Sequence, residues 1–124
     1  HTGVMPAVIK SVEAVDDNIG RLIKVLQEVG GVLVCSADHG NADDMVQLDK
    51  KTNELMRDKE GNLLMKTAHS LNPVPVYVYD TAETANVRIA TVDNPGISSL
   101  AATCIVMLGF EVPENYTPSL VDVG

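Results

Sequence analysis

The sequence predicts an α/β fold with a mostly parallel sheet between helices, and its first 35 residues carry the two observations that predict it. Apolar side chains recur at steps of three and four before residue 30, which is the period of an amphipathic helix. The continuous apolar run Val32–Cys35 follows, and strands that helices cover on both faces have this pattern. A helix followed by a buried strand is the repeating unit of open α/β folds.

The first helix has recognisable ends. Pro6 fits a first helical turn, where it removes no intrahelical hydrogen bond, and Gly30-Gly31 supplies a left-handed stop. We therefore expect a helix of about six or seven turns whose apolar stripe lies in the core. The stripe consists of Met5, Val8, Ile9, Val12, Val15, Ile19, Leu22, Ile23, Leu26 and Val29.

Residues 43–66 form a charged segment that holds five of the nine basic residues and six of the seventeen acidic ones. Such a composition indicates a solvated surface excursion, and we expect a hairpin inserted into the fold. Its turn is predicted at Lys59–Asn62 and its arms at Met45–Leu48 and Asn62–Met65.

Two further strands are predicted after this segment. Pro73–Tyr79 resumes the sheet, with Pro75 best placed at the first residue of the strand because proline cannot donate to a ladder. Asn86–Ile89 reads as a short strand, and the C-terminal tail reads as a loop that closes on Leu120-Val121.

A second helix is predicted from Ser98 to Leu108, with Gly109 ending it. Its expected apolar face consists of Leu100, Ala101, Cys104, Ile105 and Leu108. Cys104 and the other cysteine, Cys35, both lie in apolar surroundings, so they read as buried thiols of a reducing compartment, which fits a cytoplasmic protein.

Charge and hydropathy restrict the partners of this 124-residue chain, which has the size of one domain. A formal net charge of −8 argues against binding to nucleic acid or to an anionic membrane, because both would be repelled. No apolar run is long enough for a membrane span. A phosphorylated substrate would need positive charge from metal ions or from other polypeptide.

Asp38 and His39 are candidate metal ligands just past the carboxyl end of the first strand, where ligands bind in open α/β folds. Gly40-Asn41 lets the backbone leave the strand there, so that both side chains can face one ion. The other histidines are His1 and His69, and imidazole with carboxylate suits zinc, manganese, iron, cobalt or nickel. The local pattern also allows a hydrogen-bonded loop at Asp38-His39.

Three segments in a fixed order carry a resemblance to a known family. His1–Gly3, Ser36–Asp43 and Thr67–Pro75 resemble the C-terminal part of the cofactor-independent (2,3-bisphosphoglycerate-independent) phosphoglycerate mutases, which belong to the alkaline phosphatase superfamily. The resemblance covers almost the whole chain, including Gly109–Pro113. It implies a three-layer alkaline-phosphatase-like fold, of which residues 1–124 would be the C-terminal part of the metal-binding domain.

The resemblance also implies a two-ion site. Asp38 and His39 would bind one divalent ion, while His1 and His69 would bind the other. The family's ions are commonly manganese, with magnesium, cobalt or zinc as alternatives.

The family interconverts 3-phosphoglycerate and 2-phosphoglycerate, a glycolytic reaction, through a phosphoserine intermediate. Its nucleophilic serine and its basic substrate-binding residues are expected in an N-terminal part of the same enzyme, outside this chain. The chain would therefore contain no catalytic residue of its own, would supply metal ligands only, and would be inactive alone.

Other functions remain compatible with the ligand set. One is a related enzyme of the same superfamily, such as a phosphopentomutase or a phosphomonoesterase. Another is a non-catalytic metal-binding module. The sequence Asn72–Pro75 favours the mutase among them.

Overall fold

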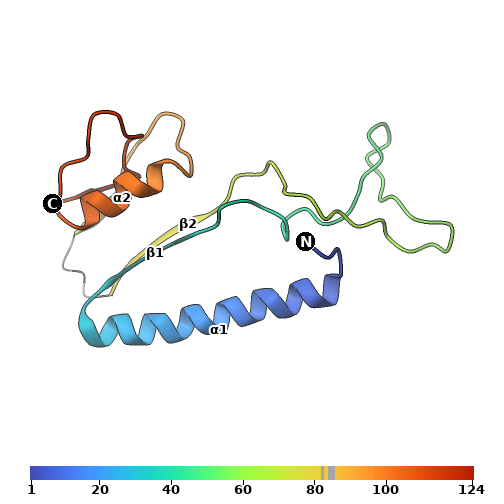
Figure 1. Ribbon diagram of the computed structural model, residues 1–124, viewed down its shortest axis with the longest axis horizontal. Coiled ribbons are helices and arrows are strands. Elements are labelled where there is room, and N and C mark those ends of the chain that lie inside the picture. Colours follow the sequence, from blue (N-terminus) through green and yellow to red (C-terminus); the bar gives the residue numbers. More distant parts are fainter. Residues whose placement is uncertain (82, 84–85) are drawn as a thin grey trace. The chain divides into compact units, whose positions relative to one another are not determined.

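The computed structural model describes residues 1–81, 83 and 86–124. They fall into two compact units, one formed by residues 1–22 and 36–75 and the other by residues 23–35 and 76–124. None of the described helices is both long enough and apolar enough to cross a membrane. In chain order the elements are α1 (Met5–Val29), β1 (Val32–Ser36), β2 (Val76–Asp80), β3 (Val87–Ile89), α2 (Ser99–Met107) and β4 (Val121–Val123) (Figure 1).

The predicted first helix is confirmed as α1, but its apolar stripe is not in a core. The helix ends as expected, since Gly30 has a φ of 70° and the Gly31 N–H donates to the Leu26 carbonyl at 2.9 Å. No residue of α1 is buried, and Val15 is 58% exposed. A helix of 25 residues is about 37 Å long, and the described elements cover its apolar side only in part, since Val8, Ile19, Ile23 and Leu26 are half-buried.

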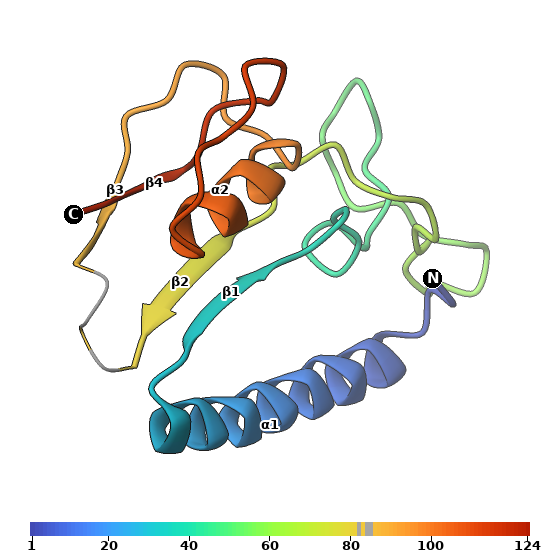
Figure 2. The same ribbon diagram turned by 60° about the vertical axis from the view of Figure 1, so that its left-hand side comes forward.

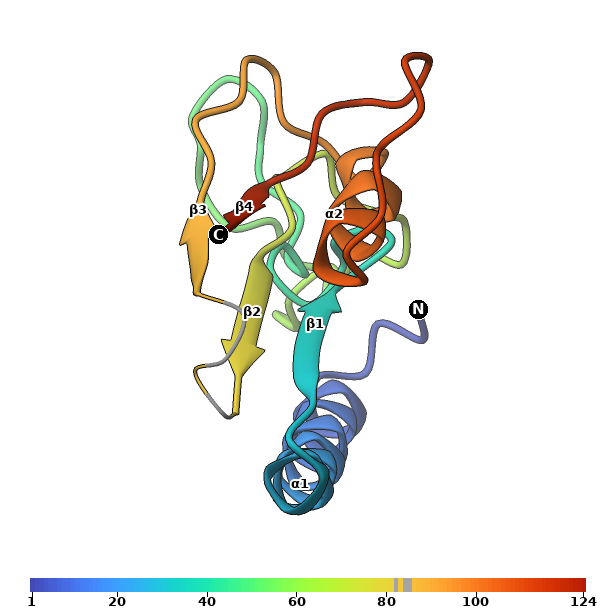
Figure 3. The ribbon, with the colours of Figure 1, turned by 90° about the vertical axis from the view of Figure 1, so that its left-hand side faces the viewer.

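Strands β1 and β2 confirm the predicted strands at Val32–Cys35 and Pro73–Tyr79, the latter beginning directly after Pro75. They pair with each other, and their arrows point in opposite directions (Figure 3). At one end the Thr81 N–H donates to the Gly31 carbonyl at 3.2 Å. This pair is antiparallel, because the chain returns to β2 without the helical crossover that a parallel neighbour requires.

A second antiparallel pair joins β3, the predicted strand at Asn86–Ile89, to β4. Val87 lies opposite Val123, and Ile89 lies opposite Val121. Figure 2 shows the pair beside α2. The C-terminal tail, expected to be a loop, thus contains strand β4.

The second helix is confirmed as α2, which Gly109 follows with a φ of 79°. Its predicted face of Leu100, Ala101, Cys104, Ile105 and Leu108 is wrong, because the buried residues are Ser99, Ala102 and Thr103. Cys104 is exposed rather than buried, and Cys35 is half-buried. The polar residues of this helix, Ser99 and Thr103, lie one turn apart on the buried side, so the usual rule that polar residues face solvent gives the wrong orientation.

Thr103 connects α2 to the segment before β4. Its hydroxyl donates to the Ser99 carbonyl at 2.8 Å and accepts from the Leu120 N–H at 2.9 Å. Thr103 is fully buried, and so are Ala102 on the same helix and, at 1% exposed, Val121 of β4. One hydroxyl therefore satisfies two backbone groups where the helix meets the strand.

Two turns fold the charged segment 43–66, where one was predicted. The expected turn is present, because the Asp58 N–H donates to the Asn62 carbonyl at 2.9 Å. A second turn is present in which the Asn53 N–H donates to the Asp49 carbonyl at 2.8 Å. The predicted arms do pair, since Val46 forms an antiparallel bridge with Met65. Asp49 and Asp58 cap their own turns with side-chain hydrogen bonds, which lower the pKa of both carboxyl groups.

Substituting Thr103→Val keeps the shape of the side chain but leaves the Leu120 N–H without its acceptor. We expect the free energy of unfolding to fall by about 1–3 kcal/mol and the Leu120 amide to exchange hydrogen faster. Thr117→Val is the control, because its hydroxyl bonds only the exposed Ser98 hydroxyl. Equal stability losses in the two variants, with unchanged Leu120 exchange, would contradict this role of Thr103.

Candidate metal centre

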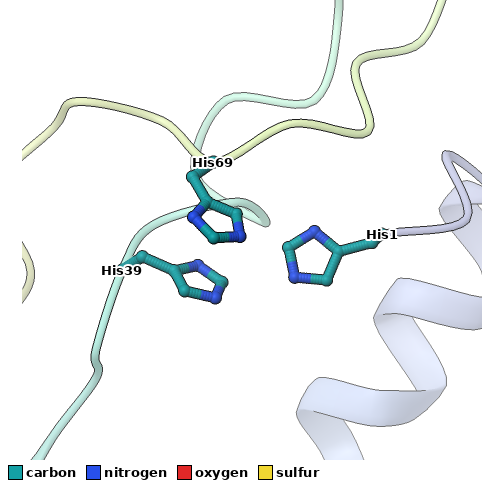
Figure 4. Close-up of side chains that lie close together, drawn as sticks. All are labelled: His1, His39 and His69. Atoms are coloured by element: carbon teal, nitrogen blue, oxygen red, sulfur yellow. The ribbon is translucent and has the colours of Figure 1, made fainter.

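Three histidines from separate segments meet in the structure (Figure 4). His1 precedes α1, His39 follows β1, and His69 lies in the segment that returns to β2. The rings of His39 and His69 stack, with centroids 3.6 Å apart and an interplanar angle of 7°. The His1 ring lies 5.1 Å from that of His39 and 4.9 Å from that of His69.

The ligand atoms of these imidazoles lie within 4.8 Å of one another. A nitrogen ligand sits about 2.0–2.1 Å from a bound zinc ion, so two ligands of one ion are at most about 4.2 Å apart. The observed spread of the three ligand atoms is thus close to that of the ligands of one ion. Neutral imidazole is a good ligand for divalent zinc, copper, iron or nickel, so the residues present fit a metal.

Backbone carbonyls orient two of the rings. His1 Nδ1 lies 3.1 Å from the Thr67 carbonyl oxygen, and His39 Nδ1 lies 3.2 Å from that of Gly40. With the proton on Nδ1, each ring donates to its carbonyl and keeps the Nε2 lone pair for a ligand bond. Metal-binding histidines commonly use this arrangement, because the second bond fixes both tautomer and ring direction.

Asp38 lies beside the cluster and not within it. Its side chain is 88% exposed, and its Oδ1 is 3.7 Å from His39 Nε2. The resemblance assigned His39 to one ion with Asp38, and His1 and His69 to another. The structure brings all three imidazoles together and leaves the carboxylate at their edge.

Hydrogen bonds join the segment after β1 to the segment before β2, next to the histidines. Gly40 and Ser70 form an antiparallel bridge in which the Ser70 N–H donates to the Gly40 carbonyl at 2.8 Å. The Asn41 amide donates to the Ala68 carbonyl at 2.9 Å. These bonds flank His39 and His69 directly, so they fix the distance between the two segments that carry the rings.

Asp43 adds a side-chain connection between the same segments, which the sequence analysis missed. Its Oδ2 accepts from the Ser70 hydroxyl and from the Asn72 amide, both at 2.7 Å. These donors, Ser70 first and then Asn72, lower the pKa of the Asp43 carboxyl. Asp43 lies close to His39 in the sequence, and Ser70 and Asn72 lie close to His69. This closeness to candidate ligands is the feature of the sequence that could have pointed to these residues.

Comparison with known proteins gives a family and several relatives for the chain. Residues 1–112 match the model of the Metalloenzyme superfamily. The 2,3-bisphosphoglycerate-independent phosphoglycerate mutase of Trypanosoma brucei brucei is 45% identical over 100% of the chain and 22% of its own length. A probable enzyme of the same name from Leptospira interrogans is 42% identical over 98% of the chain and 22% of its own length.

A solved structure agrees. The phosphoglycerate mutase of Leishmania mexicana, studied at low cobalt concentration, superposes with a TM-score of 0.90 at 45% identity. The superposition covers 100% of this chain and 23% of the Leishmania chain. The predicted α/β class and partial alkaline-phosphatase-like fold are therefore confirmed.

The chain spans about a fifth of the length of the curated relatives it matches. The resemblance seen in the sequence motifs is confirmed by these relatives and by the solved structure. With a family model that matches residues 1–112 of 124, the chain belongs to the metalloenzyme superfamily.

Proposed function

We propose that this chain is the metal-ligating portion of a cofactor-independent phosphoglycerate mutase, which interconverts 3-phosphoglycerate and 2-phosphoglycerate. The observation that carries the proposal is the meeting of His1, His39 and His69, each from a segment that motivated the resemblance. The relatives that match nearly the whole chain bear the mutase name. Their name favours the mutase over a phosphopentomutase, a phosphomonoesterase or a non-catalytic metal-binding module.

The proposed ligands are His1, His39, His69 and Asp38, holding two divalent ions. Asp38 and His39 would hold one ion, and His1 and His69 would hold the other. Manganese is the proposed metal, with magnesium, cobalt and zinc as alternatives.

Bound ions would supply Lewis acidity and would offset negative charge on phosphoryl oxygens. The chain's own residues have three tasks. Carbonyls of Thr67 and Gly40 direct His1 and His39, the bridge between Gly40 and Ser70 holds His39 near His69, and Asp38 adds an exposed carboxylate at the edge. A chain of net charge −8 needs such ions, or basic groups elsewhere, to attract a phosphorylated substrate.

The remaining parts of the reaction are proposed to lie outside this chain. They are the nucleophilic serine that becomes phosphorylated and the basic residues that bind the substrate phosphate and carboxylate. The protein would then act in glycolysis in the cytoplasm, with the small phosphorylated substrate and the rest of the same enzyme as its partners.

The first test removes imidazoles one at a time. In the full-length protein we expect His39→Ala and His69→Ala to weaken manganese binding, measured by calorimetry, because each removes a ligand. Asp49→Ala is the control, since that carboxylate only caps its own turn with the Lys51 and Thr52 N–H groups. Manganese binding that is the same in both histidine variants as in the wild type would refute the ligand assignment.

The second test concerns Asp38. We expect Asp38→Ala to lower phosphoglycerate mutase turnover by more than about 100-fold, the upper range for a residue that only supports a ligand. Turnover would be followed at saturating manganese, with Asp49→Ala as the control at near wild-type rates. Wild-type turnover in Asp38→Ala would remove Asp38 from the proposed ligand set.

A further inference from the structure

We propose that Asp43 is a positioning residue that sets the separation of His39 and His69 by joining the segments that carry them. The inference rests on the proposed metal site and assigns a role to a carboxylate that does not bind the metal. It stands on the hydrogen bonds and close packing around Asp43, Gly40 and Ser70.

One oxygen atom makes the connection. Asp43 lies four residues after His39, and its Oδ2 accepts from Ser70, the residue directly after His69, at 2.7 Å. The same Oδ2 accepts from the Asn72 amide at 2.7 Å. Two points of the His69 segment are thus held to a single atom of the His39 segment, which restrains both position and direction.

Gly40 makes this connection tight. A Cβ added to Gly40 would overlap the Ser70 hydroxyl and lie 2.5 Å from Asp43 Oδ1. The Gly40 carbonyl meanwhile accepts from the Ser70 N–H at 2.8 Å. The two segments are therefore in contact through backbone on one side and through the Asp43 carboxylate on the other, with no room for a side chain at Gly40.

The positions of the His39 and His69 rings depend on the distance between the two segments. His39 is the residue before Gly40, and His69 is the residue before Ser70, so the two residues lie diagonally across the antiparallel Gly40–Ser70 bridge, where long side chains can still meet. Their rings stack at 3.6 Å. Asp43 has its Oδ2 occupied by two donors, which leaves it suited to hold the segments and not to replace an imidazole as ligand.

The test uses cobalt(II) as the probe in the full-length protein, because its visible absorption depends on the number and geometry of its ligands. We expect Asp43→Ala to weaken cobalt binding by about 10- to 100-fold, as supporting residues of metal sites do, and to change the absorption spectrum. We expect Asp43→Asn to lose less, because an amide oxygen at the same place can accept both hydrogen bonds without the charge.

Asp58→Ala is the matched control. Asp58 is also an exposed carboxylate that accepts side-chain and backbone hydrogen bonds, from Asn62 and Glu60, but they lie within its own turn. Its cobalt affinity and spectrum should equal those of the wild type. A loss as large as that of Asp43→Ala would overturn the inference, because the effect would then be a general consequence of removing a turn carboxylate.

The outcomes separate the inference from the proposed function. If His69→Ala weakens cobalt binding while Asp43→Ala keeps wild-type affinity and spectrum, the metal site stands and the role of Asp43 is overturned. If His39→Ala and His69→Ala both bind cobalt like the wild type, the metal site and the inference fail together.

Variants of the two donors decide the case in which Asp43→Ala does not fold. Ser70→Ala and Asn72→Ala remove the side chains that donate to Asp43 Oδ2. We expect the double variant to weaken cobalt binding and to change the absorption spectrum, because the carboxylate then no longer joins the two segments. Wild-type cobalt affinity and spectrum in the double variant would overturn the connection.

Discussion

The contact on which the candidate site depends is the antiparallel return of the chain beside β1. The Ser36 hydroxyl donates to the Pro75 carbonyl at 2.9 Å, and beyond that point Gly40 pairs with Ser70. These contacts place His39 and His69, the residues before the two bridge partners, diagonally across the bridge, and their rings stack. Two histidines that are 30 positions apart in sequence thus become neighbours when the two segments pair.

Local patterns predicted the elements, while their pairing and orientation required information that is not local. The step of three and four found α1, and Gly30 marked its end, because both effects act within a few residues. The recurrence of apolar residues at every third or fourth position does not indicate what packs against the apolar side of α1. In α2 the polar Thr103 is buried where its hydroxyl accepts a hydrogen bond from the Leu120 N–H. Leu120 lies 17 residues later in the sequence, so a local pattern could not indicate this burial.

In the candidate site, too, some features follow from local sequence and others require the folded structure. Its histidines could be named from residue type and motif order, and the structure brings them together. The connection through Asp43 could not be named, because an aspartate followed 27 residues later by a serine has no recognisable spacing. It exists only once the two segments lie together, and the Gly40–Ser70 bridge is what brings them there.

Charge explains why such a cluster is suited to a cation. The rings of His39 and His69 stack with centroids 3.6 Å apart. Neutral imidazole is the form that binds a metal. The ionised Asp43 and the exposed Asp38 add negative charge close to the rings, which favours a cation there over an anion. A divalent ion bound at this place would reverse the local sign, and an acidic chain could then meet a phosphorylated ligand.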